Sequence, residues 1–265
     1  MKKQLINFAR CSTITRRGGA AAEAIVFGTS VRESVLRLGL RQYFRSTYRR
    51  WWGWQPTGEP HFSLHNKLLF DLFEGTIGDG VYALTRAFFS AEVVQTRDVV
   101  LDIGCGDGSY TKRFYAPRAA RVDGIDIEKS AVDYAQAHNA AANIRYQKLD
   151  ATTDPFPSKS YNVVIFDGAL GHFSRGDTDA LLAKISVHLT PDGLFCGSES
   201  LGREAGHDHL QYFDTLDDLR HVLLASFKFV TLKAVTYHAG EKNDRVEAYW
   251  RCSNAQERLT QIQWT

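Results

Sequence analysis

Short apolar runs and amphipathic segments alternate along the chain from about residue 95 onward. Apolar runs of about four to eight residues, rich in β-branched and aromatic side chains, are typical of buried strands. Strand-like runs, some apolar and some alternating apolar with polar residues, lie at Val99–Asp102, Arg121–Ile127, Ile144–Leu149, Tyr161–Phe166, Leu194–Ser198, Phe229–Tyr237 and Arg245–Cys252. The pattern therefore predicts seven strands.

The segments between these runs predict helices and turns. The expected helices are Ser130–Asn139, Asp177–Leu189 and, after an N-cap box at Thr215–Asp218, Leu219–Leu224. Thr190–Gly193 (TPDG) predicts a turn, and the last two strands are expected to form a hairpin across Gly240–Asp244. The alternation predicts an α/β fold with a seven-stranded, mostly parallel sheet, helices on both faces and an antiparallel terminal hairpin.

Three glycines at alternate positions follow the first predicted strand. Residues 99–114 read VVLDIGCGDGSYTKRF, with Gly104, Gly106 and Gly108 shortly after Asp102. Glycine suits a tight turn in which a Cβ would obstruct the backbone and in which a ligand lies against the main chain. The strand, glycine turn and helix entry are typical of a nucleotide-binding βαβ unit.

The order of the acid and the glycines distinguishes two kinds of nucleotide-binding site. Dinucleotide-binding folds use G-x-G-x-x-G to hold a pyrophosphate, whereas this chain has D-x-G-x-G-x-G. The chain resembles the class I S-adenosylmethionine-dependent methyltransferases in this first motif, and the resemblance extends over about Gln95–Cys252. It implies a Rossmann-like fold, S-adenosylmethionine as cofactor and transfer of a methyl group.

The resemblance assigns cofactor contacts to the ends of the predicted strands, where open α/β sheets bind ligands. It implies that Asp102 and the glycine turn hold the methionine end, that Asp126 accepts the ribose hydroxyls and that Asp150 addresses the adenine. The predicted cofactor residues are Asp102, Gly104, Gly106, Asp126, Ile127, Asp150, Ala151 and Asp167. Each aspartate alone also suits a turn or a cap. Their order at the ends of consecutive strands favours cofactor binding.

Histidines are the candidate catalytic residues. The fourth strand continues into DGALGHF, from Asp167 to Phe173, which resembles the family's fourth motif beside the transferred methyl group. His172 is predicted to be a general base for a hydroxyl acceptor, because an imidazole titrates near neutral pH. His172 also suits a helix cap or a pocket wall. His207 and His209 lie in a loop that covers the acceptor in related enzymes, and they are the alternative bases or acceptor contacts.

The same residues raise the alternative of a metal centre. Asp167 with His172, His207 and His209 offers carboxylate and imidazole ligands. However, His207 and His209 are two residues apart on a predicted loop, and the chain lacks an identifiable set of the further acid and amide ligands of the metal-assisted catechol methyltransferases. The sequence therefore predicts no metal.

The N-terminal part differs from the rest in charge. Residues 1–60 hold eleven Lys or Arg and three Glu, a net charge of +8, whereas the remainder, with 21 basic and 27 acidic residues, carries −6. Residues 33–54 predict a helix with an apolar row beside a basic row, followed by tryptophans: Leu36, Leu40, Phe44 and Tyr48; Arg37, Arg41, Arg45 and Arg49; Trp51, Trp52 and Trp54. The pattern indicates either peripheral contact with an anionic membrane or packing on the domain. Residues 1–22 weakly resemble a transit peptide or a flexible leader.

Composition sets the broad class. Hydrophobic residues make up 44% and charged residues 23% of the chain, as in ordinary soluble proteins, and no run approaches the roughly 18 apolar residues of a membrane span. The four scattered cysteines, without a C-x-x-C pair, indicate a reduced compartment and no zinc site. The expected organisation is a basic arm (1–58), a helical lid or substrate region (59–94) and a methyltransferase domain (95–265).

The expected function is methyl transfer from S-adenosylmethionine to a small-molecule or glycan acceptor, with oxygen favoured as the acceptor atom. The fourth motif reads FDGALGH and lacks the N-P-P-Y type of signature of nitrogen methylation. Two alternatives stay open: an RNA methyltransferase that uses the basic arm, and a non-catalytic cofactor-binding subunit that activates a partner. We expect no nucleic-acid partner and a cytoplasmic location, with residues 33–54 at the inner face of the membrane.

Overall fold

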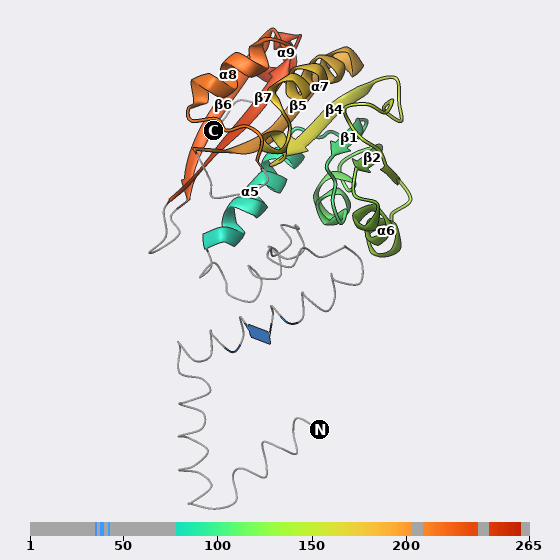
Figure 1. The fold of residues 1–265 in the computed structure, drawn as a ribbon. Coiled ribbons are helices and arrows are strands. Elements are labelled where there is room, and N and C mark those ends of the chain that lie inside the picture. Colours follow the sequence, from blue (N-terminus) through green and yellow to red (C-terminus); the bar gives the residue numbers. More distant parts are fainter. Residues whose placement is uncertain are drawn as a thin grey trace, which may run out of the picture. The chain divides into compact units, whose positions relative to one another are not determined.

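The computed structural model describes residues 78–202, 209–237 and 244–260, together with the isolated positions 35, 38, 39 and 42. Backbone contacts divide the chain between Gly58 and Glu59, and the fold described below belongs to the second part. Its described residues form a seven-stranded sheet in the order β3-β2-β1-β4-β5-β7-β6 (Figure 1). The strands are β1 (Val99–Ile103), β2 (Arg121–Asp126), β3 (Ile144–Lys148), β4 (Tyr161–Asp167), β5 (Leu189–Leu201), β6 (Phe229–Tyr237) and β7 (Arg245–Ser253).

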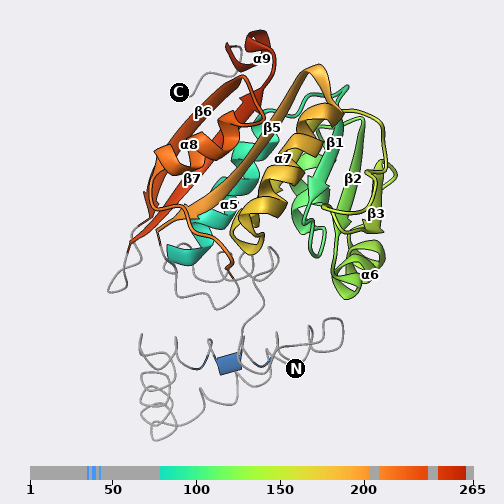
Figure 2. The ribbon, with the colours of Figure 1, turned by 45° about the horizontal axis from the view of Figure 1, so that its top comes forward.

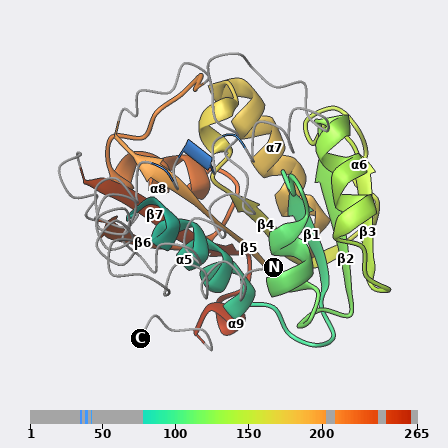
Figure 3. The same ribbon diagram turned by 90° about the horizontal axis from the view of Figure 1, so that it is seen from below.

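The sheet is parallel except for the hairpin at its end. Neighbours among β1 to β5 run parallel, and β7 lies between β5 and β6 and is antiparallel to both. Helices cover both faces (Figures 2 and 3). On one face lie α5 (Gly78–Glu92), the π-helical turn η1 (Thr111–Tyr115), α6 (Lys129–His138) and α9 (Gln256–Thr260); on the other lie α7 (Arg175–His188) and α8 (Leu216–Leu224). The predicted fold class is confirmed.

Both faces of the central strands are apolar because both are covered. In β4, the side chains of Val163 and Ile165 pack in the core beneath α5 and η1, whereas Val164 and Phe166 pack beneath α7 and α8. All four are buried. Three aspartates lie at or near the carboxyl ends of neighbouring parallel strands: Asp102 in β1, Asp126 in β2 and Asp167 in β4, which is followed by the 3-10 turn η2 (Leu170–His172).

The predicted turn at Thr190–Gly193 is wrong, because these residues belong to β5. Leu189 lies opposite Tyr161 and Leu194 lies opposite Val163, so the intervening residues bulge out of the ladder. Pro191 has no N–H to donate to a neighbouring strand, and proline within sheets occurs at such bulges. The turn signal therefore marked an irregularity inside a longer strand.

Helix starts follow their caps. The Ser174 hydroxyl accepts a hydrogen bond from Asp177 N–H (3.2 Å), so α7 begins at Arg175, two residues before the predicted start. The predicted N-cap box of α8 is confirmed: Thr215 and Asp218 each accept a hydrogen bond from the other's backbone N–H. No described helix has the length and apolar character needed to cross a membrane.

Candidate active site

The glycine turn after β1 leaves an open backbone surface. Gly104, Gly106 and Gly108 have positive φ angles of 70°, 53° and 73°, which residues with a Cβ rarely adopt. Among the described residues, a Cβ built on Gly104 would have only the Ala169 Cβ within 4 Å, at 4.0 Å, whereas a Cβ on Gly108 would overlap the Tyr146 ring. Gly104 therefore leaves room for a ligand, and Gly108 is required by packing.

Asp126, the last residue of β2, ties this strand to the glycine turn. Gly106 N–H donates to Asp126 Oδ2 (2.9 Å), and Glu128 N–H donates to Asp126 Oδ1 (2.8 Å). Burial raises the pKa of Asp126, although these two hydrogen bonds act in the opposite direction. Ile127 beside it is 63% exposed, so its side chain is accessible to a ligand. Two predicted cofactor residues thus lie at the rim of the turn.

Asp102 is buried in β1, one residue before its end, close to two other carboxylates. The Thr111 hydroxyl donates to Asp102 Oδ2 (2.5 Å). Burial, together with the negative charges of Asp167 and Asp126, raises the pKa of Asp102 to about 7, although the Thr111 hydrogen bond acts in the opposite direction. A positively charged ligand beside these carboxylates would stabilise their ionised forms.

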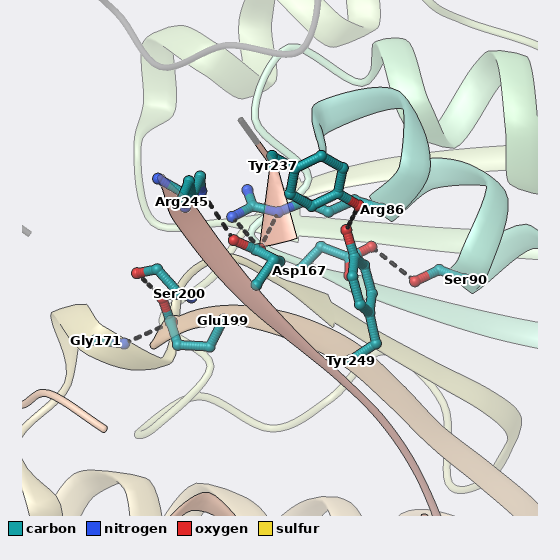
Figure 4. Close-up of polar contacts among 10 residues, drawn as sticks. Arg86, Ser90, Asp167, Gly171, Glu199, Ser200, Tyr237, Arg245 and Tyr249 are labelled. Atoms are coloured by element: carbon teal, nitrogen blue, oxygen red, sulfur yellow. Dashed lines mark hydrogen bonds and ion pairs between the residues drawn. The ribbon is translucent and has the colours of Figure 1, made fainter. Parts of the chain in front are cut away.

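Asp167 ends β4 inside a dense polar cluster (Figure 4). Its Oδ2 accepts hydrogen bonds from the hydroxyls of Ser90 (2.8 Å) and Tyr115 (3.0 Å). Burial raises the pKa of Asp167 to about 6, and the positive charge of Arg86 opposes that rise. Asp167 Oδ1 is buried and has no hydrogen-bond partner in the described part of the chain, so a donor or cation of a ligand can pair with it.

Asp150, predicted to address the adenine, caps its own loop. Its Oδ1 accepts hydrogen bonds from Thr152 N–H (2.8 Å) and the Thr152 hydroxyl (2.6 Å), and these bonds lower the pKa of Asp150. Ala151 is buried in the core beneath α7. The turn role and the cofactor role are compatible, because the turn fixes the backbone beside the carboxylate. The cofactor role of both residues stays a prediction.

The fold brings two of the three candidate histidines together. His172 ends η2 and is exposed, and its ring meets the edge of the His209 ring with centroids 4.7 Å apart. The segment that carries His209 is fixed to η2, because Leu210 N–H donates to Gly171 O (2.8 Å). His207 lies outside the described residues. A catalytic role for any of the three stays a prediction.

The metal-centre alternative uses Asp167, His172, His207 and His209, of which His207 lies outside the described residues. Among residues 78–202, 209–237 and 244–260, no three His, Cys, Asp or Glu side chains form a ligand group. Asp167 is half-buried and accepts hydrogen bonds from Ser90 and Tyr115, whereas His172 is exposed. The two side chains therefore occupy different environments.

Sequence reasoning missed the charged residues around Asp167. Glu247 of β7 is fully buried and accepts hydrogen bonds from Arg86 Nε (2.7 Å) and Arg245 Nε (3.0 Å). Glu199 of β5 is also buried and accepts a hydrogen bond from a backbone N–H of η2 (2.9 Å). Both glutamates could have been noticed in the sequence, because each lies inside a strand-like run: Glu247 in RVEAYW and Glu199 in CGSES.

Comparisons with known proteins agree with this geometry. A family described as a methyltransferase domain matches residues 100–193. An uncharacterized methyltransferase of Mycobacterium tuberculosis is 34% identical over 107 residues, 40% of this chain and 53% of the relative, so this chain spans about half of that relative's length. A fatty-acid O-methyltransferase of Mycolicibacterium smegmatis is 27% identical over 107 residues, 39% of this chain and 38% of that relative. The solved DhpI–SAH complex shares the fold, with a TM-score of 0.51 and 17% identity over 73% of this chain and 96% of that chain.

The family match covers β1, β2, β3 and β4 and the start of β5, which includes every aspartate described above. This chain carries a class I S-adenosylmethionine-dependent methyltransferase domain. The predicted family is confirmed. The described residues of the methyltransferase domain also fit the family's cofactor. The space over Gly104 is open, Asp167 Oδ1 has no partner in the described part of the chain, and the raised pKa values of Asp102 and Asp167 suit a cationic ligand.

Proposed function

We propose that this chain transfers the methyl group of S-adenosylmethionine to an oxygen atom of a small-molecule or glycan acceptor. The observation that carries the proposal is the group of aspartates around the glycine turn, in which Asp102 is buried and Asp126 and Asp167 are half-buried. Burial raises the pKa of Asp102 to about 7 and that of Asp167 to about 6. S-adenosylmethionine carries positive charge on its sulfonium and its ammonium, and that charge favours the ionised carboxylates.

When bound, S-adenosylmethionine supplies a methyl group on a sulfonium that is already activated toward a nucleophile. The chain then has to hold an acceptor in line with that methyl group and remove the acceptor's proton. In this proposal, Asp102, Gly104 and Gly106 hold the methionine end, Asp126 and Ile127 the ribose, Asp150 and Ala151 the adenine, and Asp167 lies beside the reacting centre.

The proposed base is His172 or His209. Their rings are in contact directly after the motif that contains Asp167. A neutral imidazole can take the proton of a hydroxyl acceptor, which an oxygen acceptor requires. One relative is named for fatty-acid O-methylation, and others are named for lysine or ribosomal-protein methylation, so their names do not agree on an acceptor.

Labelled S-adenosylmethionine tests the reaction and the base together. The wild-type chain and the variants His172→Ala, His207→Ala and His209→Ala are incubated with fractionated small molecules, glycans and RNA. We expect label in the small-molecule or glycan fraction, and about a 10²–10⁴-fold loss of turnover for His172→Ala with cofactor affinity unchanged. Loss of turnover in a loop variant alone would move the role to that histidine.

The same experiment separates the two alternative functions. Salt-sensitive labelling of RNA would favour an RNA methyltransferase that uses the basic arm. Cofactor binding without label in any fraction, followed by turnover once a second protein is added, would favour an activating subunit. Either result would replace the proposed acceptor class.

We also propose that the chain works in the cytoplasm and that residues 33–54 bind the inner face of the membrane. The support is the arginine row beside the apolar row in the sequence, since this segment lies outside the described residues apart from isolated positions.

A further inference from the structure

Helix α5 packs on the sheet through buried charges as well as apolar side chains. Glu247 on β7 has no exposed surface and is paired with two arginines, Arg86 of α5 and Arg245 at the start of β7. Farther along the same interface, Arg251 of β7 pairs with Glu92 of α5 (2.5 Å). Burying charged groups is costly even when they are paired, and such pairs contribute little net stability. The α5–β7 ion pairs are therefore expected to do more than hold the helix on the sheet.

The Arg86 guanidinium lies against the backbone directly after Asp167. Gly168 has a φ of 66°, and a Cβ built on it would overlap that guanidinium. Ser90, one helical turn after Arg86, donates its hydroxyl to Asp167 Oδ2 (2.8 Å). Two successive turns of α5 are thus directed at the end of β4 (Figure 4).

We propose that Arg86 is a positioning residue for Asp167: Glu247 holds the guanidinium against Gly168, and the guanidinium stabilises the negative charge that Asp167 presents to the cofactor. The effect of Arg86 on cofactor binding rests on the proposed function. The effect of Arg86 on the pKa of Asp167 does not, because it is present in the cofactor-free chain. Glu247 is then the anchor that fixes where the positive charge of Arg86 lies.

The groups that act on Asp167 come from every element packed around it. They are Arg86 and Ser90 of α5, Tyr115 of η1, Asp102 of β1, Cys196 of β5 and Glu247 of β7. Burial raises the pKa of Asp167 and Glu247 adds to the rise, whereas Arg86, Ser90 and Tyr115 act in the opposite direction. Arg86 and Glu247 therefore have opposite effects on the same carboxyl group, although they are bonded to each other.

This opposition gives two variants with opposite expected results. The pKa of Asp167 is measured in the cofactor-free chain by carboxyl NMR titration. Arg86→Met should raise it from about 6 by about one to three units, because it removes the positive charge that most strongly opposes the effect of burial. Glu247→Gln should lower it, because the glutamine oxygen still accepts a hydrogen bond from Arg86 Nε and holds the guanidinium in place while the negative charge is gone. Arg86→Lys, which retains the charge, should restore most of the wild-type value.

Arg251→Met is the matched control, because it breaks another α5–β7 ion pair and Arg251 is not among the largest effects on the pKa of Asp167. It should leave the pKa of Asp167 unchanged even where it lowers stability. Equal pKa values in wild type, Arg86→Met and Glu247→Gln would overturn the proposal. So would a shift in one direction shared by Arg86→Met, Glu247→Gln and Arg251→Met, since a purely structural anchor would produce it.

Calorimetry at pH 7 tests the consequence for the cofactor. A rise of two units would leave about one tenth of Asp167 ionised, so S-adenosylmethionine should bind Arg86→Met about tenfold more weakly. S-adenosylhomocysteine, which lacks the sulfonium charge, should lose less. Equal losses for both ligands would overturn the link to the cofactor charge. Failure of the wild-type chain to bind either ligand would instead refute the proposed function, and the NMR titration would still decide the role of Arg86.

Discussion

At the scale of single residues, the Asp126 carboxylate holds the glycine turn and is also the proposed acceptor of the ribose hydroxyls. Asp126→Ala removes the proposed ribose acceptor and releases the Gly106 N–H that the structure shows bonded to it. Charge-assisted hydrogen bonds contribute about 1.5–3 kcal/mol, so we expect about 10- to 150-fold weaker binding of S-adenosylmethionine.

Calorimetry measures this loss, with circular dichroism to check the fold. Asp126→Asn is the control, because its side-chain oxygen still accepts from Gly106 while the charge is gone. Unchanged affinity in a folded Asp126→Ala chain would remove Asp126 from the site.

Three of the acids in this site could be predicted from the sequence, and their partners could not. Asp102, Asp126 and Asp167 stand at or near the ends of parallel strands, and such ends meet at one edge of a sheet. Arg86 and Glu247 are 161 positions apart, and their pairing depends on how α5 lies on β7. The hydrophobic pattern places a helix or a strand but does not specify which charged side chains become buried together.

At the scale of elements, two glycines of the glycine turn exclude a side chain for different reasons: Gly104 faces the proposed cofactor site, and Gly108 packs against Tyr146. Gly104→Ala should cost about 1–2 kcal/mol for the positive φ alone and should weaken cofactor binding by about tenfold or more, because its Cβ enters the open space. Gly108→Ala should lose more stability, because its Cβ also overlaps the Tyr146 ring.

Urea unfolding and calorimetry on the two variants measure both effects. If Gly104→Ala bound the cofactor with wild-type affinity, the space over the turn would not be the cofactor site.

The N-terminal arm is an element whose role its charge pattern predicts. Each arginine near an anionic surface adds about 1 kcal/mol of attraction, which weakens as salt screens it. We expect the full chain to sediment with anionic liposomes at low salt and a chain starting at Gly58 to stay in the supernatant. The shortened chain should still bind cofactor, since every cofactor motif follows Gln95. Equal, negligible sedimentation of both chains would reject the membrane proposal.

Elements with a strong period could be placed from the sequence, and irregular ones could not. The capping box at Thr215 and the hairpin strands Phe229–Tyr237 and Arg245–Ser253 lie where, or within one residue of where, the pattern predicted them. β5 begins five residues before its predicted start, because Pro191 and Gly193 mark a bulge as readily as a turn. Proline and glycine indicate the local backbone geometry, but they do not indicate whether the strand continues to pair with its neighbour after them.

At the scale of the whole molecule, burial of Asp102 makes stability depend on pH. Its pKa is about 7 in the folded chain against 3.8 as the ordinary value, so the folded state holds the proton more tightly. The stability that this proton contributes is present below about pH 4 and is lost as pH rises to about 7, an effect on the order of a few kcal/mol.

Asp102→Asn, which cannot ionise, should lack this loss. We expect the variant to match wild type below about pH 4 and to become progressively more stable than wild type up to about pH 7, measured by urea unfolding without cofactor. A difference between the two chains that does not change with pH would contradict the raised pKa.

The strand order also has a consequence for how the protein is made. Among the described strands, β6 pairs only with β7, and β7 also pairs with the outer side of β5, yet β7 is the last of these strands to be synthesised. Strands β1 to β4 can pair as they leave the ribosome, while β5 keeps one bare edge and β6 has no neighbour. A ribosome that stalls between Tyr237 and Arg245 would therefore release a chain with unpaired strand edges, which are templates for aggregation. The sheet can therefore be completed only after β7 has been synthesised.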